Sequence, residues 1–102
     1  MTSAPDVNWS TWRAPDAVRG AQLSGQLAKE IGAAHDLFDL KDVLTIIAAD
    51  GASDDVLGIT PCGTVLYVIH LTWSQTPDPM GDFPMIQYLD ASDLPKGVQP
   101  FL

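Results

Sequence analysis

The hydrophobic and polar positions follow a two-residue period most clearly over residues 63–74. This stretch is rich in β-branched and aromatic residues and contains no proline, which is typical of a strand. Alternation gives one face that is apolar except for a tyrosine hydroxyl and an opposite face that is apolar only at its start. We therefore expect a central strand with something covering each side for part of its length. The two faces are Val65, Tyr67, Ile69, Leu71 and Trp73, and Leu66, Val68, His70 and Thr72.

Residues 15–33 have the spacing of an amphipathic helix. Polar residues, among them Gln26 and Glu30, are assigned mostly to the side away from the core. Gly20 and Gly25 each weaken the helix by about 1 kcal/mol relative to alanine, and we interpret them as a sign of close packing against a sheet. The predicted apolar stripe consists of Val18, Leu23, Leu27 and Ile31.

Three further apolar runs predict the strands around the central one. Residues 42–50 form the first, and residues 56–59 form a short strand paired with it after the Asp50-Gly51 turn. Residues 85–89 form the last strand, which Pro84 places at an edge. Short links between strands predict antiparallel pairing. We expect one domain over residues 1–102, a two-layer α+β fold with three to four strands and an N-terminal helix on one face.

The two ends of the chain carry aromatic and helix-limiting residues. Trp9 and Trp12 are expected to cover one end of the core, because each indole has a large area to bury. An exposed aromatic patch for a partner is the alternative. Ser92-Asp93 predicts one short helical turn, which later prolines keep from extending.

The chain is strongly acidic, with 13 acidic and 5 basic residues and a net charge of −8. This balance disfavours contact with a phosphate backbone, so we expect no nucleic-acid partner. No apolar run approaches the roughly 20 residues of a membrane span, so we expect no membrane partner. The charge favours either solubility alone or a basic protein partner. A single cysteine and a polar start to the sequence predict a cytoplasmic location.

Neither a metal-ligand spacing nor a cofactor motif is present, so we expect no cofactor and no metal. We also expect no enzymatic activity, because the sequence shows no nucleophile–base arrangement. A small Cys/His enzyme that uses Cys62, His70 and Asp54 or Asp55 remains an alternative. Otherwise His70 is expected to bond a neighbouring carboxylate or carbonyl, as buried polar groups normally do.

The loop over residues 75–84 contains three prolines, which exclude a helix or an interior strand. Aromatic and acidic side chains on a stiff loop favour contact with a protein. The alternative is a loop folded back on the core through Met80 and Phe83. The predicted partner-binding residues are Asp54, Asp55, Trp73, Asp78, Met80, Asp82 and Phe83.

The stretch Asp54-Asp55-Val56-Leu57, followed by His70-Leu71-Thr72-Trp73 and a proline-rich loop, resembles a group of small uncharacterised bacterial proteins. That resemblance implies no activity. In size, acidity and layout the chain is similar in type to bacterial immunity proteins, which neutralise a cognate toxin. We therefore expect an acidic module that binds a basic protein, such as a toxin domain. A homo-oligomeric structural or accessory protein is the alternative.

Overall fold

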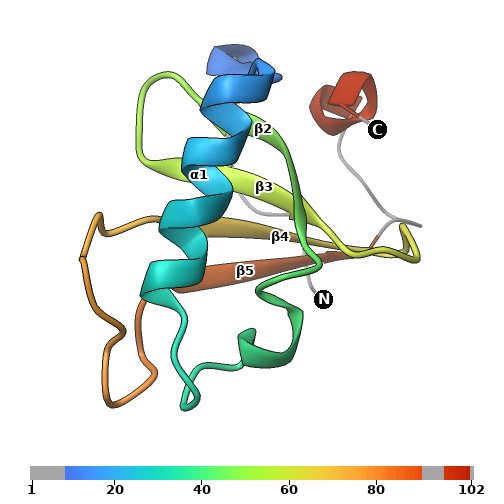
Figure 1. Cartoon of the computed structure of the whole chain (residues 1–102). Helices are drawn as coiled ribbons and strands as arrows, with labels where there is room; N and C mark the ends of the chain where they lie inside the picture. Colours follow the sequence, from blue (N-terminus) through green and yellow to red (C-terminus); the bar gives the residue numbers. More distant parts are fainter. Residues whose placement is uncertain (1–8, 91–95, 102) are drawn as a thin grey trace.

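The computed structural model describes residues 9–90 and 96–101, and Figure 1 shows one helix lying across a sheet. The five strands form a single antiparallel sheet in the order β1-β2-β3-β4-β5. The predicted α+β fold with one helix is confirmed, and the Ser92-Asp93 turn lies outside the described residues. No helix in the described ranges has the length and apolar character needed to cross a bilayer. The elements are η1 (Trp9–Thr11), β1 (Trp12–Arg13), α1 (Ala17–Glu30), η2 (Phe38–Leu40), β2 (Thr45–Asp50), β3 (Asp55–Ile59), β4 (Val65–His70), β5 (Met85–Asp90) and η4 (Lys96–Phe101).

The sheet has five strands, so the predicted count of three to four is wrong. The additional strand is β1, whose Trp12 pairs with Asp50 at the free edge of β2. The Thr11 hydroxyl donates to the Asp50 carboxylate at 2.5 Å, and the Gly51 amide donates to the Thr11 carbonyl at 2.9 Å. These bonds hold the segment before α1 against β2. The sequence did not predict β1, because a strand of two residues is too short to show a period.

Asp50 also organises the turn between β2 and β3. Its carboxylate accepts hydrogen bonds from the Ala52 amide and the Ser53 hydroxyl, both at 2.9 Å. Burial raises the pKa of Asp50, but the bonds from Thr11, Ala52 and Ser53 outweigh it and hold the pKa below its usual value. The ionised carboxylate is therefore the form that supports this turn.

β4 is an interior strand, paired with β3 on one side and β5 on the other, which confirms the prediction for its position. The strand ends at His70, earlier than expected, because the chain then turns through a left-handed Trp73 with φ 60°. Trp73 is consequently 39% exposed, and its predicted place on the covered face is wrong. The other predicted strands form, with β5 at an edge and β2 starting at Thr45.

The two faces of the sheet are covered to different extents. The face under α1 is buried by Leu23 and Leu27 of the helix, by Ile31 directly after it, and by the connection that follows. On the opposite face, Trp12 and Val98 pack over Leu66 and Leu89. Its other end stays open, since His70 and Met85 are exposed there. The prediction that each face of the central strand is covered for part of its length is confirmed. The prediction that Trp12 covers one end of the core is also confirmed.

Helix α1 is shorter than predicted and presents a different stripe to the sheet. It begins after Asp16, whose side chain accepts from the Arg19 amide at 2.7 Å. Val18 is 70% exposed, because five residues before Leu23 turn it about 140° away from the sheet side. Conversely, Gln26 and Glu30 are buried, so their predicted place on the outer side is wrong.

The two helix glycines do not mark close packing, so that interpretation is also wrong. A Cβ added at Gly25 meets no atom within 4 Å, and one added at Gly20 comes no closer than 3.8 Å to Pro15. Gly81 in the β4–β5 loop differs, because its φ is 76° and an added Cβ would lie near the Ala34 carbonyl. Only Gly81 requires the absence of a side chain in this comparison.

We expect Gly25→Ala to raise the free energy of unfolding by about 1 kcal/mol, because alanine restricts the unfolded chain and fits the open space. Urea denaturation measures the change. Gly81→Ala is the matched control and should destabilise the protein. Equal effects of the two substitutions on the free energy of unfolding would contradict the conclusion that Gly81, and not Gly25, requires the absence of a side chain.

Candidate functional site

The candidate site is built around the carboxylate of Glu30, in the last turn of α1. Glu30 is 2% exposed. One carboxylate oxygen accepts from the Thr72 amide and hydroxyl, both at 2.7 Å. The other accepts from the Trp73 amide at 3.0 Å and the Gln26 side-chain amide at 2.9 Å. Four neutral donors therefore satisfy both oxygens of a buried charge.

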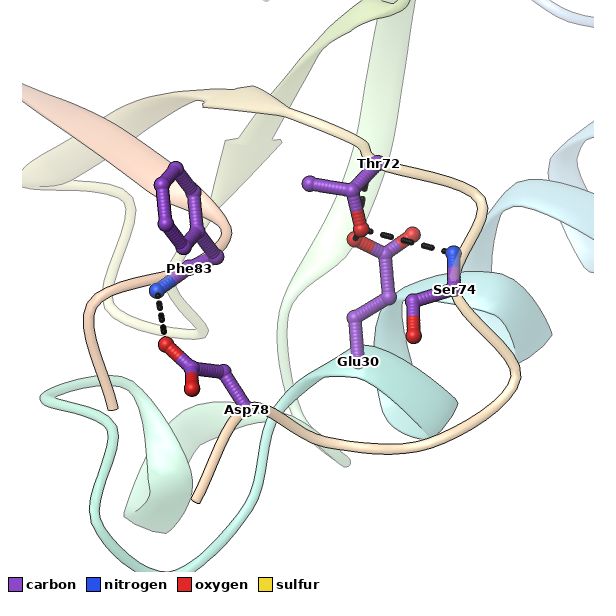
Figure 2. A pocket seen from close by; sticks show the side chains of 5 residues that line it. All are labelled: Glu30, Thr72, Ser74, Asp78 and Phe83. Carbon is purple, nitrogen blue, oxygen red and sulfur yellow. Dashed lines mark hydrogen bonds between the residues drawn. The ribbon is translucent and has the colours of Figure 1, made fainter. Parts of the chain in front are cut away.

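The same contacts fix the path of the chain as it leaves β4. The Gln26 side-chain amide also donates to the Ser74 carbonyl at 2.8 Å. The Ser74 amide donates to the Thr72 hydroxyl at 3.3 Å (Figure 2). Trp73, between these two residues, adopts the left-handed conformation that non-glycine residues rarely use. The helix thus holds the first part of the β4–β5 loop (residues 71–84) in a turn that the sequence alone disfavours.

Asp78 fixes the second part of this loop. One carboxylate oxygen accepts from the Met80 amide at 3.1 Å. The other accepts from the Asp82 amide at 3.0 Å and from the Phe83 amide at 3.3 Å, and Figure 2 shows the bond from Phe83. The carboxylate is therefore a local cap for its own loop, a common role for aspartate in turns.

The loop also packs against the connection that follows α1. Buried His35 accepts from the Leu37 amide through Nδ1 at 3.0 Å, so its Nε2 donates to the Pro84 carbonyl at 2.8 Å. Met80 and Phe83 are 76% and 49% exposed. The alternative in which these two side chains fold the loop onto the core is therefore wrong, because His35 and the backbone of the loop make the attachment.

A pocket of about 320 Å³ lies between the loop and the end of α1. Figure 2 shows Phe83 and Asp78 on one side and Glu30, Thr72 and Ser74 on the other. Carbon atoms form most of its wall. Within residues 9–90 and 96–101 the salt bridges are Lys41–Asp42 and His70–Asp55, and none of these four residues lines the pocket.

The structure divides the seven predicted partner-binding residues among different places. Asp78 and Phe83 line the pocket, and Met80 and Asp82 are exposed beside them on the loop. At the start of the loop, the Trp73 indole donates to Asp54 at 3.0 Å. Asp55 follows Asp54 in the chain, and its carboxylate contacts His70 at the start of β3.

His70 and Asp55 bond at 2.6 Å on the open end of the sheet face opposite α1. They line a pocket of about 410 Å³ together with Met85 and Gln87. Cys62 lies in the turn before β4, at the opposite end of that strand from His70. The structure therefore forms the His70–Asp55 pair of the Cys/His alternative and does not bring Cys62 to it.

Sequence analysis did not identify Glu30, Thr72 or Ser74 as site residues. A signal for Glu30 was present, since it follows Leu23 by seven residues and Leu27 by three, which places it on the buried stripe. It is also the one glutamate in the chain. A carboxylate on the apolar phase of a helix indicates a buried acceptor with dedicated donors.

Comparisons with protein-family models, curated proteins and solved structures find no match for this chain. The described residues contain no group of three or more histidine, cysteine, aspartate or glutamate side chains that could hold a metal ion. The function is therefore argued from the geometry and charge of the site.

We expect Glu30→Gln to lower the free energy of unfolding by about 2 kcal/mol or more, since the new amide would face donors that are left without an acceptor. Urea denaturation gives the free energy, and the Trp73 signals in an amide NMR spectrum report the turn. Asp36→Asn, at an exposed position, is the control. If both variants are as stable as the parent, Glu30 does not hold the loop.

Hydrogen bonds from Thr60 and Thr64 lower the pKa of the exposed Cys62 thiol to about 7. We expect the rate of iodoacetamide alkylation to rise with pH and reach half its plateau near pH 7, because the thiolate is the reacting form. Thr64→Val, which removes the hydroxyl 2.9 Å from the sulfur, should move the midpoint upward. A parent midpoint near 8.5, the usual thiol value, would contradict this effect.

Proposed function

We propose that the protein is an acidic binding module that captures a basic protein, in the manner of an immunity protein that neutralises a toxin. The observation that carries the proposal is that the β4–β5 loop exposes apolar side chains on a backbone held by hydrogen bonds. Met80 and Phe83 are exposed on it, while Glu30 and Asp78 fix its backbone through hydrogen bonds. A loop that presents apolar side chains in a fixed geometry loses little entropy when a partner binds.

The exposed side chains supply the apolar part of an interface. Exposed methionine and aromatic residues are enriched at the centres of protein interfaces, and a few of them usually provide most of the binding energy. Trp73, which is 39% exposed, extends this surface toward the start of the loop. Polar residues around the three side chains, among them Asp82, form the rim.

The charge of the chain supports a basic partner. A net charge of −8 on 102 residues produces a negative field that accelerates the approach of a cationic protein. The lysines and arginines around the substrate cleft of a basic toxin would be drawn to this surface, and the loop would block the cleft. The function needs no cofactor, and we place it in the cytoplasm.

Homo-oligomer formation is a second candidate, and the edge strand β5 favours it. Met85 and Tyr88 on this strand are 62% and 56% exposed, and β5 pairs on one side only. An edge strand with exposed apolar side chains can pair with a second copy. This surface is distinct from Met80 and Phe83, so variants of each separate the two candidates.

Capture from the native lysate tests the proposed function, with the purified protein as bait. We expect the parent protein to retain one basic protein, and the Met80→Ser/Phe83→Ser double variant to lose it. A Val18→Ser/Met85→Ser double variant, which removes exposed apolar side chains elsewhere, should retain it. The rate at which the two proteins associate should fall several-fold when salt is added, and Asp82→Lys should lower it by about the same factor. Asp39→Lys, which makes the same change of charge away from the loop, is the control.

Two results would reject the proposal. One is recovery of the bait alone, with a solution mass that the Val18→Ser/Met85→Ser variant reduces, which assigns the protein to the homo-oligomer class. The other is a partner that the loop variant binds as tightly as the parent does.

A further inference from the structure

We infer that the pocket between Phe83 and Glu30 holds an arginine or lysine side chain of the partner protein. The inference rests on the proposed function and names the contact through which the basic partner is recognised. It is carried by the charge of the pocket, the nature of its wall and its size.

Two residues that line the pocket, Glu30 and Asp78, carry carboxylates that form no salt bridge with a cation of the described chain. The four donors to Glu30 are backbone amides, a hydroxyl and a carboxamide, which are all neutral. The donors to Asp78 are backbone amides. No basic residue of the described chain lines the pocket. Because neutral hydrogen bonds do not cancel a charge, both carboxylates attract a cation to the space between them.

The wall of the pocket suits the rest of such a side chain. Most of the wall is carbon, and the Phe83 ring stands at one side (Figure 2). Lysine and arginine carry an aliphatic stem that packs on apolar surface and a charged end that interacts with aromatic faces. A simple inorganic cation would leave this apolar wall without a partner.

The size of the pocket and the hydrogen bonds of Glu30 limit further the class of ligand that fits. A volume of about 320 Å³ lies at the low end of the roughly 300–1,000 Å³ typical of ligand pockets, which favours one long side chain over a large cofactor. Direct metal coordination by Glu30 would compete with its four hydrogen bonds. An organic cation gains from the negative potential without displacing any of these donors.

The pocket is also placed where an approaching partner would reach it. Phe83 both lines the pocket and is 49% exposed, and the 76% exposed Met80 lies three residues away on the same loop. An apolar surface that covers Met80 and Phe83 would bring a neighbouring basic side chain to the mouth of the pocket. This arrangement joins an apolar anchor to a charge-specific contact.

Titration of the isotope-labelled protein with short peptides tests the inference without the partner. The probes are acetyl-Gly-Arg-Gly-amide and acetyl-Gly-Lys-Gly-amide, with the neutral citrulline peptide as the matched control and agmatine as a free amine. We expect saturable shifts of the amide signals of Thr72, Trp73, Ser74 and Phe83 with a dissociation constant of about 1 mM. The citrulline peptide should bind at least tenfold more weakly.

Two variants separate the contributions of the ring and the charge. Phe83→Leu keeps an apolar wall and should weaken arginine binding about threefold, whereas Phe38→Leu, at another exposed ring, should have no effect. Asp78→Asn should also weaken binding, with Asp39→Asn as its control. The same spectra show whether each variant keeps the fold, so a weaker titration in a folded variant is attributable to the pocket.

The outcomes distinguish this inference from the proposed function. Equal binding of the citrulline and arginine peptides, or the absence of shifts, overturns the cation pocket, even if the loop captures a basic protein. Agmatine binding tenfold tighter than the peptides overturns the partner side chain as the occupant and assigns the pocket to a free amine. Peptide binding without any captured partner keeps the cation pocket and rejects the proposed function.

Discussion

The buried carboxylate of Glu30 joins the end of helix α1 to the exit of strand β4 through three hydrogen bonds, and a fourth comes from the helix itself. Burying a charge costs several kcal/mol unless hydrogen bonds compensate for the lost water, and here Gln26, Thr72 and Trp73 supply them. Loss of the carboxylate would leave these donors unsatisfied at the place where two elements meet. Glu30 is therefore the residue through which the helix determines where the loop begins, although it lies in a different layer.

The loop combines two properties that usually oppose each other. Its apolar side chains are exposed, which generally accompanies mobility, yet its backbone is held at both ends. Glu30 fixes the turn at Trp73, Asp78 caps the segment that carries Met80, and His35 holds the Pro84 carbonyl. Binding surfaces built in this way reach useful affinity from few contacts, because the entropy lost in ordering the loop is lost during folding and not on binding.

The features predicted from the sequence are those with a local cause. Repeated β-branched residues identified β4, and the Asp50-Gly51 pair identified the turn between β2 and β3. β1 was not predicted because two residues carry no period. Asp78 could not be assigned, since an aspartate that caps its own loop and one that faces a partner have the same sequence signature. Glu30 was placed on the wrong side because its polarity outweighed its spacing, and three of its four donors lie 42 and 43 residues away.

The order of the strands has a consequence for how the molecule is assembled. β2 to β5 each pair with their neighbour along the chain, so three successive hairpins can form from contacts that are close in sequence. The pairing of Trp12 with Asp50 and the bonds of Glu30 to Thr72 close much longer stretches of chain. Loop-closure entropy makes such distant contacts slow to form on their own. We expect the hairpins to fold first and the surface around Glu30 to be completed late, when the helix docks.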